Sequence, residues 1–382
     1  MKKKRNILLI SFVLFLIGCA SYNNRIEKKF IQGIWAFESE INKSYIKDTT
    51  FDFKHRRPIV FDFKKNNIVQ IRKYGIKDTV FNVKWYLKSD SILKIDSLNY
   101  KIYKLNKNKF SIMDFTKVDT VLLNFKKPRK TKIKYSKSEI ENILLSNIWK
   151  NKDGRDRSEY NSSEFFKNKS MVYRYKMSKT DSIEYLQNEN WGIAEYQNYY
   201  FLYYYSDYFL GKGNWDQLNQ ILKISPNHFS LEDYNNTSET HFYRKTSNVK
   251  KPNIIGNWTS KNSNSKNYGD FISKIDIERG DTELFKGELN IKISDHFIEL
   301  KLDTLQLGRY KWELGKDNRT ILIKKKYEGE LRKGSFIYLA DIIEKNKDYL
   351  KMHIFENQFL TGIEKPRLLI VNKIQEFKKQ KN

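Results

Sequence analysis

The 382-residue chain has a single cysteine, Cys19, and only five prolines. One cysteine cannot form an intramolecular disulfide, so a fold held together by disulfide bridges is excluded. The scarcity of proline, together with 25 tyrosines and 25 phenylalanines, argues against a disordered chain and favours β-strands. The most apolar stretch, 7–17, is shorter than the about 20 residues that a helix needs to cross a bilayer core. The sequence therefore predicts no transmembrane helix.

The first residues have the pattern of an export signal. Basic residues at 2–5 precede the apolar stretch, and the letters LIGC end at Cys19. This ending resembles the bacterial lipobox, in which a peptidase cuts before a cysteine that then carries lipid. The resemblance implies a lipoprotein signal peptide at 1–18, acylation of Cys19, palmitate included, and a tether at 19–29. An ordinary cleaved signal with an incidental cysteine is the alternative.

The Lys-, Asn-, Ile- and Tyr-rich composition resembles that of lipoproteins of the Bacteroidota type. In those proteins, acidic residues directly after the cysteine mark export to the cell surface. Here the letters ASYNN follow Cys19 and contain no acid. The resemblance therefore implies an outer-membrane protein held by its lipid, with the periplasmic face favoured over the cell surface.

The charge of the chain is strongly one-sided, with a formal net charge of +27. Such an excess suits acidic partners such as anionic lipid headgroups, polysaccharide or nucleic acid. However, the cations are 57 lysines and only 15 arginines, and recognition of phosphates and bases prefers arginine. The densest run, KKPRKTKIK, spans Lys126 to Lys134, while other charges alternate along expected strands. We interpret the lysines as a solvated surface and predict no nucleic-acid partner.

Tryptophan, present only seven times, reveals a repeat of domain size. Trp35, Trp149 and Trp258 open similar phrases, spaced by 114 and 109 residues. After each opening follow, in the same order, a strand phrase, a second tryptophan, a hairpin phrase and a closing strand. The chain therefore predicts three tandem domains at 30–130, 131–250 and 251–382.

The expected local structure is β nearly throughout. KLNKNKFSIMDF from Lys104 and KISPNHFSLEDY from Lys223 alternate polar and apolar residues on both sides of a short turn, which is typical of a hairpin. One helix is expected in SKSEIENILLSN, where Ser136 and Glu139 form a capping box ahead of Trp149.

The triplets Gly33-Ile34-Trp35 and Gly256-Asn257-Trp258, each ahead of about eight short strands, resemble the first strand of lipocalin-like domains of bacterial lipoproteins. The resemblance implies an all-β fold of three tandem antiparallel lipocalin-like barrels. It also implies that Trp35, Trp149 and Trp258 close the barrels, often under an arginine, for which Arg129, Arg244 and Arg367 are candidates. The middle copy departs from the motif, with Asn147 in place of the glycine, so closure of its barrel is the open question.

Catalytic and metal-binding patterns are missing. The five histidines show no metal-ligand spacing, and no Gly-x-Ser-x-Gly nucleophile motif occurs. The sequence predicts no metal, no cofactor and no catalytic residue. A hydrolase of the envelope is the alternative from a different functional class.

The stretch from Trp191 to Trp215 is unusually aromatic. As a strand it places Tyr199, Phe201, Tyr203 and Tyr205 on one face and further aromatics on the other. One interpretation is a platform on which a sugar or another flat ligand stacks. The other is a central barrel strand with one face in the core and one at a domain contact. These residues, with Trp191 and Trp215, are the candidate ligand-binding site.

The sequence as a whole predicts a non-enzymatic, lipid-anchored envelope protein with a binding or scaffold role. Its expected partners are the membrane, through the lipid, a small apolar or sugar ligand, and another envelope protein. Recognition of an anionic glycan by lysines and tyrosines together is the alternative binding function.

Overall fold

The structure is a computed structural model of the 382-residue chain. It describes residues 28–42, 58–75, 78–114, 121–151, 159–176, 184–205, 217–232, 239–260, 289–302, 305–326, 335–359 and 368–380. Cys19, Trp215 and Arg367 lie outside these residues. Among the described helices, none combines the length and the apolar character that a membrane span requires.

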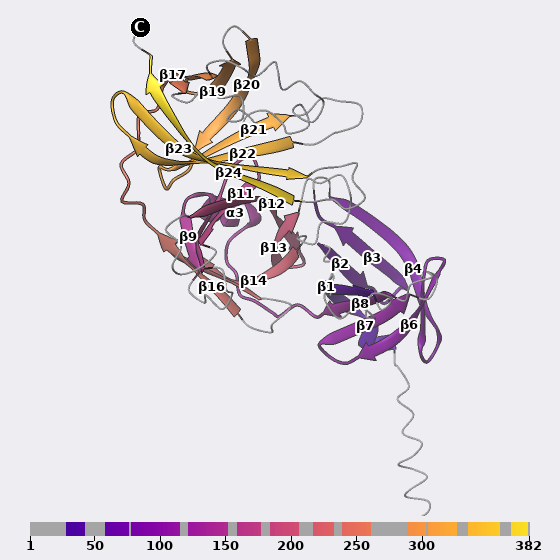
Figure 1. Ribbon diagram of the computed structural model, residues 1–382. Helices are drawn as coiled ribbons and strands as arrows, with labels where there is room; N and C mark the ends of the chain where they lie inside the picture. Colours follow the sequence, from indigo (N-terminus) through magenta and orange to yellow (C-terminus); the bar gives the residue numbers. More distant parts are fainter. Residues whose placement is uncertain are drawn as a thin grey trace, which may run out of the picture. The chain divides into compact units, whose positions relative to one another are not determined.

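The described strands form three closed barrels of eight strands each (Figure 1). Within each barrel all strand pairs are antiparallel, and strands that follow one another in the chain are neighbours. This is the architecture of an up-and-down barrel. The prediction of an all-β chain with three tandem barrels is confirmed.

By its internal contacts the chain divides into two compact units. The first unit holds the first barrel, and the second unit holds the second and third barrels. The domain limits at 130/131 and 250/251 stay a prediction, for which limited proteolysis is the test.

Barrel 1 follows a short helix, α2 (Lys28–Ile31). Its strands are β1 (Gly33–Asn42), β2 (Ile59–Phe63), β3 (Ile68–Lys73), β4 (Thr79–Ser89), β5 (Ile92–Ile95), β6 (Leu98–Leu105), β7 (Lys109–Asp114) and β8 (Val121–Lys126). The barrel closes where β1 pairs with β8, with Phe37 opposite Phe125.

Barrel 2 follows the second described helix, α3 (Lys137–Leu145). Its strands are β9 (Ile148–Asn151), β10 (Glu159–Phe165), β11 (Ser170–Lys176), β12 (Tyr185–Tyr196), β13 (Tyr199–Tyr205), β14 (Gln217–Ser225), β15 (His228–Glu232) and β16 (Glu239–Lys245). β9 pairs with both β10 and β16, so this barrel is closed although its first strand lacks the glycine of the other two. The open question raised by Asn147 is thereby answered.

Barrel 3 has no helix among its described residues. Its strands are β17 (Gly256–Ser260), β18 (Leu289–Ile293), β19 (Phe297–Leu302), β20 (Leu305–Leu314), β21 (Thr320–Lys326), β22 (Ser335–Lys345), β23 (Tyr349–Phe359) and β24 (Leu368–Lys379). It closes through β17 and β24, with Trp258 opposite Lys379.

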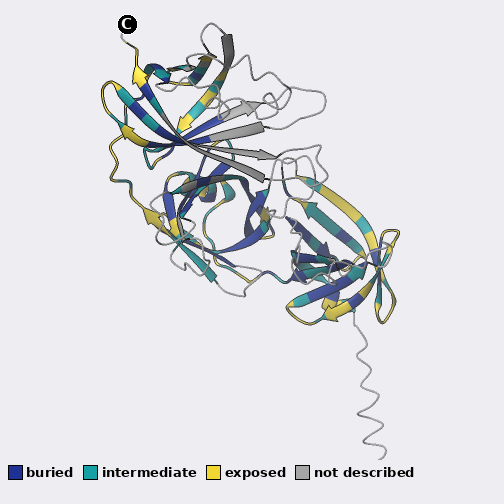
Figure 2. Cartoon of the chain, viewed as in Figure 1, coloured by how far each residue is buried: buried dark blue, intermediate teal, exposed yellow. Residues whose placement is uncertain are grey.

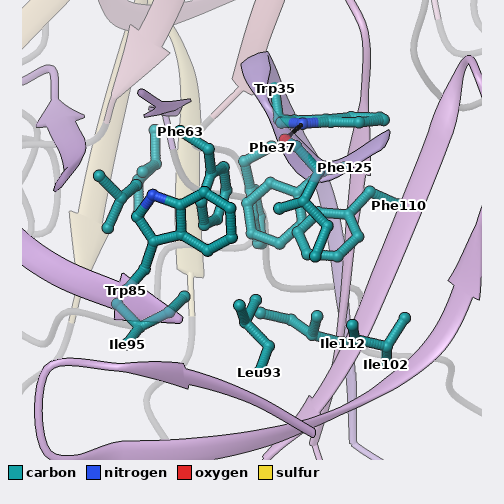
Figure 3. Packing of buried hydrophobic residues seen from close by; sticks show 13 residues of the cluster. Trp35, Phe37, Phe63, Trp85, Leu93, Ile95, Ile102, Phe110, Ile112 and Phe125 are labelled. Atoms are coloured by element: carbon teal, nitrogen blue, oxygen red, sulfur yellow. Dashed lines mark hydrogen bonds between the residues drawn. The ribbon is translucent and has the colours of Figure 1, made fainter. Parts of the chain in front are cut away.

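Aromatic rings fill the interior of barrel 1 (Figure 3). Trp35 lies 5.3 Å from Phe110, and Phe63 meets Trp85 edge to face at 5.2 Å, measured between ring centroids. These four side chains are at most 1% exposed. Ring pairs in such offset and edge-on arrangements stabilise a core beyond the area that they bury.

The opening tryptophan occupies an equivalent place in every barrel. Each is 0% exposed, and each indole N–H donates to a backbone carbonyl just ahead of the strand: Trp35 to Ile31 (2.6 Å), Trp149 to Leu144 (3.0 Å) and Trp258 to Ile254 (2.8 Å). The segment before each first strand is thus tied to the ring that it precedes. A lysine ammonium group lies above the ring in two barrels, Lys127 over Trp35 and Lys379 over Trp258, and in barrel 2 the predicted Arg244 is the strand-register partner of Trp149.

The second tryptophan of each copy is equivalent too. The indole N–H of Trp85 donates to Lys64, that of Trp191 to Phe166 and that of Trp312 to Ser294, and each accepting carbonyl lies at the turn between the second and third strands of its barrel. The weak match NWGI in the middle copy therefore marks the same structural position as KWYL and KWEL.

The repeated hairpin phrase forms the expected hairpin in both copies. In the first, β6 pairs with β7 with Leu105 opposite Phe110, and Phe110 and Ile112 are buried in the core. In the second, β14 pairs with β15, and Phe229 and Leu231 point into barrel 2. These predictions are confirmed.

The helix prediction is confirmed as well. Ser136 caps α3, with the Glu139 carboxylate accepting from the Ser136 backbone N–H at 2.7 Å. Ile140 and Leu144 are buried in the core of barrel 2. Asn147 follows the helix, and its side-chain amide donates to the carbonyls of Ile143 (3.1 Å) and Pro226 (3.2 Å).

The backbone at Asn147 differs from the backbone at the two glycines of the motif. Gly33 and Gly256 have φ angles of +112° and +141°, which side chains rarely adopt. Asn147 is not among the residues with positive φ, so its backbone conformation does not require a glycine. Its side chain instead fastens the helix end to the turn between β14 and β15.

Barrels 2 and 3 pack against each other within the second unit. β12 of barrel 2 contacts β22 and β23 of barrel 3 (Figure 1). Five buried apolar side chains from the two barrels form one cluster: Phe166, Val172, Leu186, Leu322 and Leu339. Burial of such surface stabilises the contact by about 25 cal/mol per Å².

Beside this cluster lies a buried ionic network around Arg174. Its guanidinium donates to Asp341 at 2.9 and 3.0 Å, to Asp317 at 2.8 Å and to the Thr320 hydroxyl at 2.9 Å, while Glu184 accepts at 3.1 Å. Burial opposes ionisation of Asp317, but Arg174 and the hydrogen bonds from Thr320 and Arg319 outweigh it and keep the pKa of that carboxyl below its usual range. The three carboxylates around Arg174 thus each have a cationic partner, which offsets part of the cost of burying them.

A second buried carboxylate crosses the same contact. Glu164 of barrel 2 accepts from the backbone N–H of Lys316 at 2.6 Å and from its ammonium group at 3.4 Å. Burial raises the pKa of Glu164 to about 7, because the lysine only partly compensates for the loss of water. Gly315 allows its segment of barrel 3 to approach Glu164 of barrel 2, since a Cβ at this position would lie 2.8 Å from a Glu164 oxygen.

Candidate functional site

The aromatic strand that the sequence singled out is β13, between β12 and β14 of barrel 2. Tyr200, Leu202 and Tyr204 belong to the barrel core. Phe201, Tyr203 and Tyr205 alternate with them and therefore lie on the outer side of the strand. Figure 2 shows the middle of this strand as buried throughout.

The candidate ligand-binding residues differ in burial. Trp191 is 1%, Phe201 0% and Tyr203 7% exposed, whereas Tyr199 and Tyr205 are partly exposed. Trp191 belongs to the core, where its indole N–H is already donated to Phe166. Trp215 lies outside the described residues. Stacking of a ligand on this strand remains a prediction, for which Tyr199 and Tyr205 offer the exposed edges.

The ring of Tyr203 packs against a glycine on the neighbouring strand. Gly192 pairs with Tyr203 in the register between β12 and β13. A Cβ at Gly192 would collide with the hydroxyl and ring carbons of Tyr203, so the ring covers the bare glycine backbone. Burial raises the pKa of the Tyr203 phenol above its usual range, as expected for a ring packed down in this way.

Polar groups also point into barrel 2. The Tyr173 hydroxyl donates to Glu189 at 3.3 Å, and the rings of Tyr173 and Tyr204 are 6.4 Å apart. Burial, with the Glu189 charge next in importance, raises the pKa of Tyr204 above its usual range. A carboxylate and phenols inside an otherwise aromatic barrel are groups with which a small polar ligand could hydrogen-bond.

A basic cleft is the second candidate site, and it lies where the segment that leads into α3 crosses β14 and β16. The cleft measures about 720 Å³. Its lining comprises Arg129, Lys130, Thr131, Lys132, Ile133, Lys134, Tyr135, Leu222, Lys223, Ile224 and Glu239. We call this the basic cleft, because five of these residues are cationic and only Glu239 is acidic.

One end of the basic cleft is fixed by Arg129. Its guanidinium lies 2.7 Å from a carboxylate oxygen of Glu232, a residue that is 0% exposed. Its backbone N–H donates to Gln220 at 2.8 Å, and the Gln220 amide donates back to the Arg129 carbonyl at 2.6 Å. The segment after Arg129 is therefore attached to the outer wall of barrel 2 at a defined point.

Along this segment, burial alternates residue by residue. Lys130, Lys132 and Lys134 are exposed, while Ile133 and Tyr135 pack against the core cluster of barrel 2. Alternation of this kind is typical of an extended chain on an apolar surface. The three lysines form no ion pair with any residue in the described part of the chain.

The far wall of the basic cleft carries its one carboxylate. Glu239 lies 3.5 Å from Lys223 and 4.0 Å from His241. The Ser230 hydroxyl, then the nearby charges of Lys223 and His241, keep the pKa of Glu239 below its usual range despite partial burial. Glu239 is therefore ionised at neutral pH and offsets part of the positive charge.

Next to Glu239 lies a pair of histidines. Nε2 of His228 is 3.1 Å from Nδ1 of His241, and Tyr243 packs against His228 with 4.8 Å between ring centroids. Burial, followed by the His241 and Lys223 charges, lowers the pKa of His228. No group of three or more metal-ligating side chains occurs among the residues that the structure describes.

Sequence reasoning noticed the lysine run at 126–134 but assigned it to solvated surface. The exposed lysines fit that assignment, whereas the cleft beneath them was missed. The alternation of lysine with Thr131, Ile133 and Tyr135 was the available signal, because it predicts one apolar and one charged side. The opposite wall, with Leu222 and Lys223, could not be paired with it from sequence alone.

Comparison with known proteins finds matches among solved structures. No protein-family model matches the chain, and no curated protein sequence matches it. Among solved structures, transferrin binding protein B of Haemophilus parasuis Hp5, in a single-substitution mutant, aligns with a TM-score of 0.19 and 10% identity, covering 91% of this chain and 76% of that one. Intact Ap-TbpB aligns with a TM-score of 0.18 and 8% identity, over 91% and 76% of the two chains.

Transferrin binding protein B of serogroup B Neisseria meningitidis gives a TM-score of 0.18 and 8% identity, over 86% of this chain and 66% of that one. These scores are too low to relate the chains over their length.

Proposed function

We propose that the chain is a non-enzymatic, lipid-anchored envelope protein that binds its partners on the outer surfaces of its barrels. The observation that carries this proposal is the packing of the barrel interiors. The side chains of five residues are each 0% exposed, in the core cluster of their own barrels: Trp35, Phe110, Trp149, Trp258 and Phe377. Side chains, rather than space for cargo, occupy these described interiors, as in small filled barrels.

The anchor is the proposed lipid on Cys19 in the outer membrane, with the barrels on the periplasmic side. Several acyl chains hold a protein far more firmly than one chain, which gives only marginal binding. Mass spectrometry of the N-terminal peptide from the native host should find Cys19 acylated and first in the mature chain. Soluble, unmodified protein that begins elsewhere would contradict the anchor.

A carrier function is the second candidate, and the inward-facing Tyr173, Glu189 and Tyr204 favour it. Here the middle barrel would hold a small apolar or sugar ligand, as lipocalin-like membership implies. The packing of Trp149, Phe165 and Phe229 in the same barrel favours the filled alternative.

Native mass spectrometry separates the two functions. The mature protein is purified from its own host and weighed before and after extraction with organic solvent. A surface-binding scaffold predicts the same bare mass in both measurements. If extraction removes a small molecule of discrete mass, the result would contradict the surface-binding scaffold and support the carrier function.

A further inference from the structure

The basic cleft concentrates positive charge on one face of barrel 2. Five cations line it, while Glu239 in its lining and Glu232 behind Arg129 are the acids paired with them. Pairing with these two acids engages Arg129 and Lys223 and leaves Lys130, Lys132 and Lys134 without a partner among the described residues. An excess of positive charge in a recess attracts and concentrates anions.

The three lysines without an ion-pair partner, Lys130, Lys132 and Lys134, follow one another along the cleft. Alternate residues of an extended chain are about 7 Å apart, so the three ammonium groups form a row. A compact anion such as a single phosphate would meet one of them, or two at most. A chain with repeated negative charges can meet all three at once.

The apolar part of the lining narrows the ligand class further. Ile133, Tyr135, Leu222 and Ile224 lie along the same cleft, and each is half-buried. A tyrosine and aliphatic groups suit the C–H face of a sugar ring, which stacks on such surfaces while its substituents point elsewhere. Lysines instead of arginines, and one aromatic ring instead of a series, are a poor match for a nucleic-acid strand.

We propose that the basic cleft binds an acidic sugar chain, that is, linked sugars that carry carboxylate or phosphate groups. This inference rests on the proposed surface-binding function and names the ligand class of one such surface. The lysine row holds the acidic groups, and the apolar floor takes the sugar faces. The source of the chain is either a free acidic polysaccharide or the acidic headgroup of an envelope glycolipid.

The first experiment measures binding of oligogalacturonate to the full mature chain in neutral detergent, by calorimetry. Its methyl-esterified form, of the same length but without charge, is the matched ligand control. We expect binding of the acid and none of the ester, with an affinity that falls as salt is added, because screening weakens exposed charge contacts. Equal binding of the ester would overturn the proposal.

Variants locate the site. Lys130→Gln, Lys132→Gln and Lys134→Gln combined should weaken binding roughly tenfold, since each exposed charge contact contributes a few-fold. Lys101→Gln, Lys104→Gln and Lys107→Gln combined, all exposed on barrel 1, remove the same charge and should leave the affinity within roughly twofold. Equal losses in the two variants would mean general charge attraction and would overturn the assignment.

A variant that binds the acidic sugar chain more tightly provides a further test, because misfolding would weaken binding and not strengthen it. Glu239→Gln removes the one carboxylate of the lining and frees Lys223, so it should tighten binding roughly twofold to fivefold. Unchanged or weaker binding would contradict the proposed placement of the ligand.

Vesicles separate the two sources of the ligand. Binding to vesicles that carry a rough-type lipopolysaccharide, lost in the Lys130/Lys132/Lys134 variant, would assign the glycolipid headgroup. Equal binding to vesicles of phosphatidylglycerol, which has charge but no sugar chain, would overturn the proposal, as would the absence of binding to both the soluble acid and the glycolipid. None of these results depends on the bare mass that tests the scaffold, so the two proposals can fail separately.

Discussion

Arg174 of the second barrel and Asp341 of the third barrel are joined by two parallel hydrogen bonds of 2.9 and 3.0 Å, and both side chains are at most 6% exposed. The residues are 167 positions apart in the chain. Parallel bonds between a guanidinium and a carboxylate are among the stronger and more directional polar contacts in proteins. The second and third barrels therefore meet in a defined orientation within their unit.

Asp341→Ala tests this contact. It leaves the Arg174 guanidinium buried with fewer partners, and removal of one member of a buried ion pair costs about 3–5 kcal/mol. We expect a loss of this size in the free energy of unfolding, measured by denaturant titration of the protein. The exposed Asp295→Ala is the control and should change little. A loss no larger than in the control would show that the pair does not stabilise the contact.

Glu164 should make stability depend on pH. Its pKa in the folded chain is about 7, above the ordinary 4.5, so the folded state binds the proton more tightly than the unfolded state. The stabilisation is complete below pH 4.5 and is lost as the pH rises through about 7.

Glu164→Gln should remove this dependence and stabilise the protein above pH 7 by on the order of 3 kcal/mol at most. The glutamine keeps an oxygen that can accept from the backbone N–H of Lys316. Melting temperatures recorded from pH 4.5 to 8 would measure the effect, with the exposed Glu313→Gln as the control. Parallel curves for the Glu164 variant and the native chain would contradict the prediction.

Gly192 and Tyr203 should be energetically coupled. Gly192→Ala forces the tyrosine ring off the backbone, and overpacking of this kind costs about 1–3 kcal/mol. With Tyr203→Ala already present, the same substitution should cost much less. Unfolding free energies of the two single variants and the double variant form the cycle that measures the coupling. Additive effects would mean that the ring does not rest on the glycine.

Trp149→Phe should loosen α3. The substitution keeps an aromatic ring in the core but removes the indole N–H that Leu144 accepts, which costs about 1–2 kcal/mol. Hydrogen exchange of the α3 amides should become faster than in the native chain. The Phe242→Leu variant, which changes the same core without touching that carbonyl, is the comparison. Unchanged exchange rates in α3 would show that the hydrogen bond from Trp149 does not stabilise the helix.

The sequence allowed the repeat and the barrel class to be predicted because both depend on local pattern. Trp35, Trp149 and Trp258 recur at equivalent positions, and the alternation around Phe110 and Phe229 determines which side of each hairpin is buried. Such signals are contained within a dozen residues. These signals do not depend on how distant parts of the chain fold.

The contacts between distant segments could not be predicted. Arg72 and Arg174 occupy corresponding places in their copies, yet Arg72 meets its neighbour Gln70, whereas Arg174 meets Asp341. Strand β13 carries aromatics on both faces, so a period of two cannot tell the core face from the outer face. The basic cleft needs two walls that are far apart in the sequence, and only one of them has a recognisable pattern.

The hydrogen bond from each opening tryptophan to the residues just ahead of its strand has a consequence for biosynthesis. In each barrel the segment that accepts this hydrogen bond lies just ahead of the first strand and is therefore synthesised before it. The chain is synthesised from its N-terminus, so α2 and α3 are made before the barrels that follow them. A copy needs only its own last strand to complete its closure, and such self-contained units can be duplicated in tandem within a gene without redesign of their neighbours.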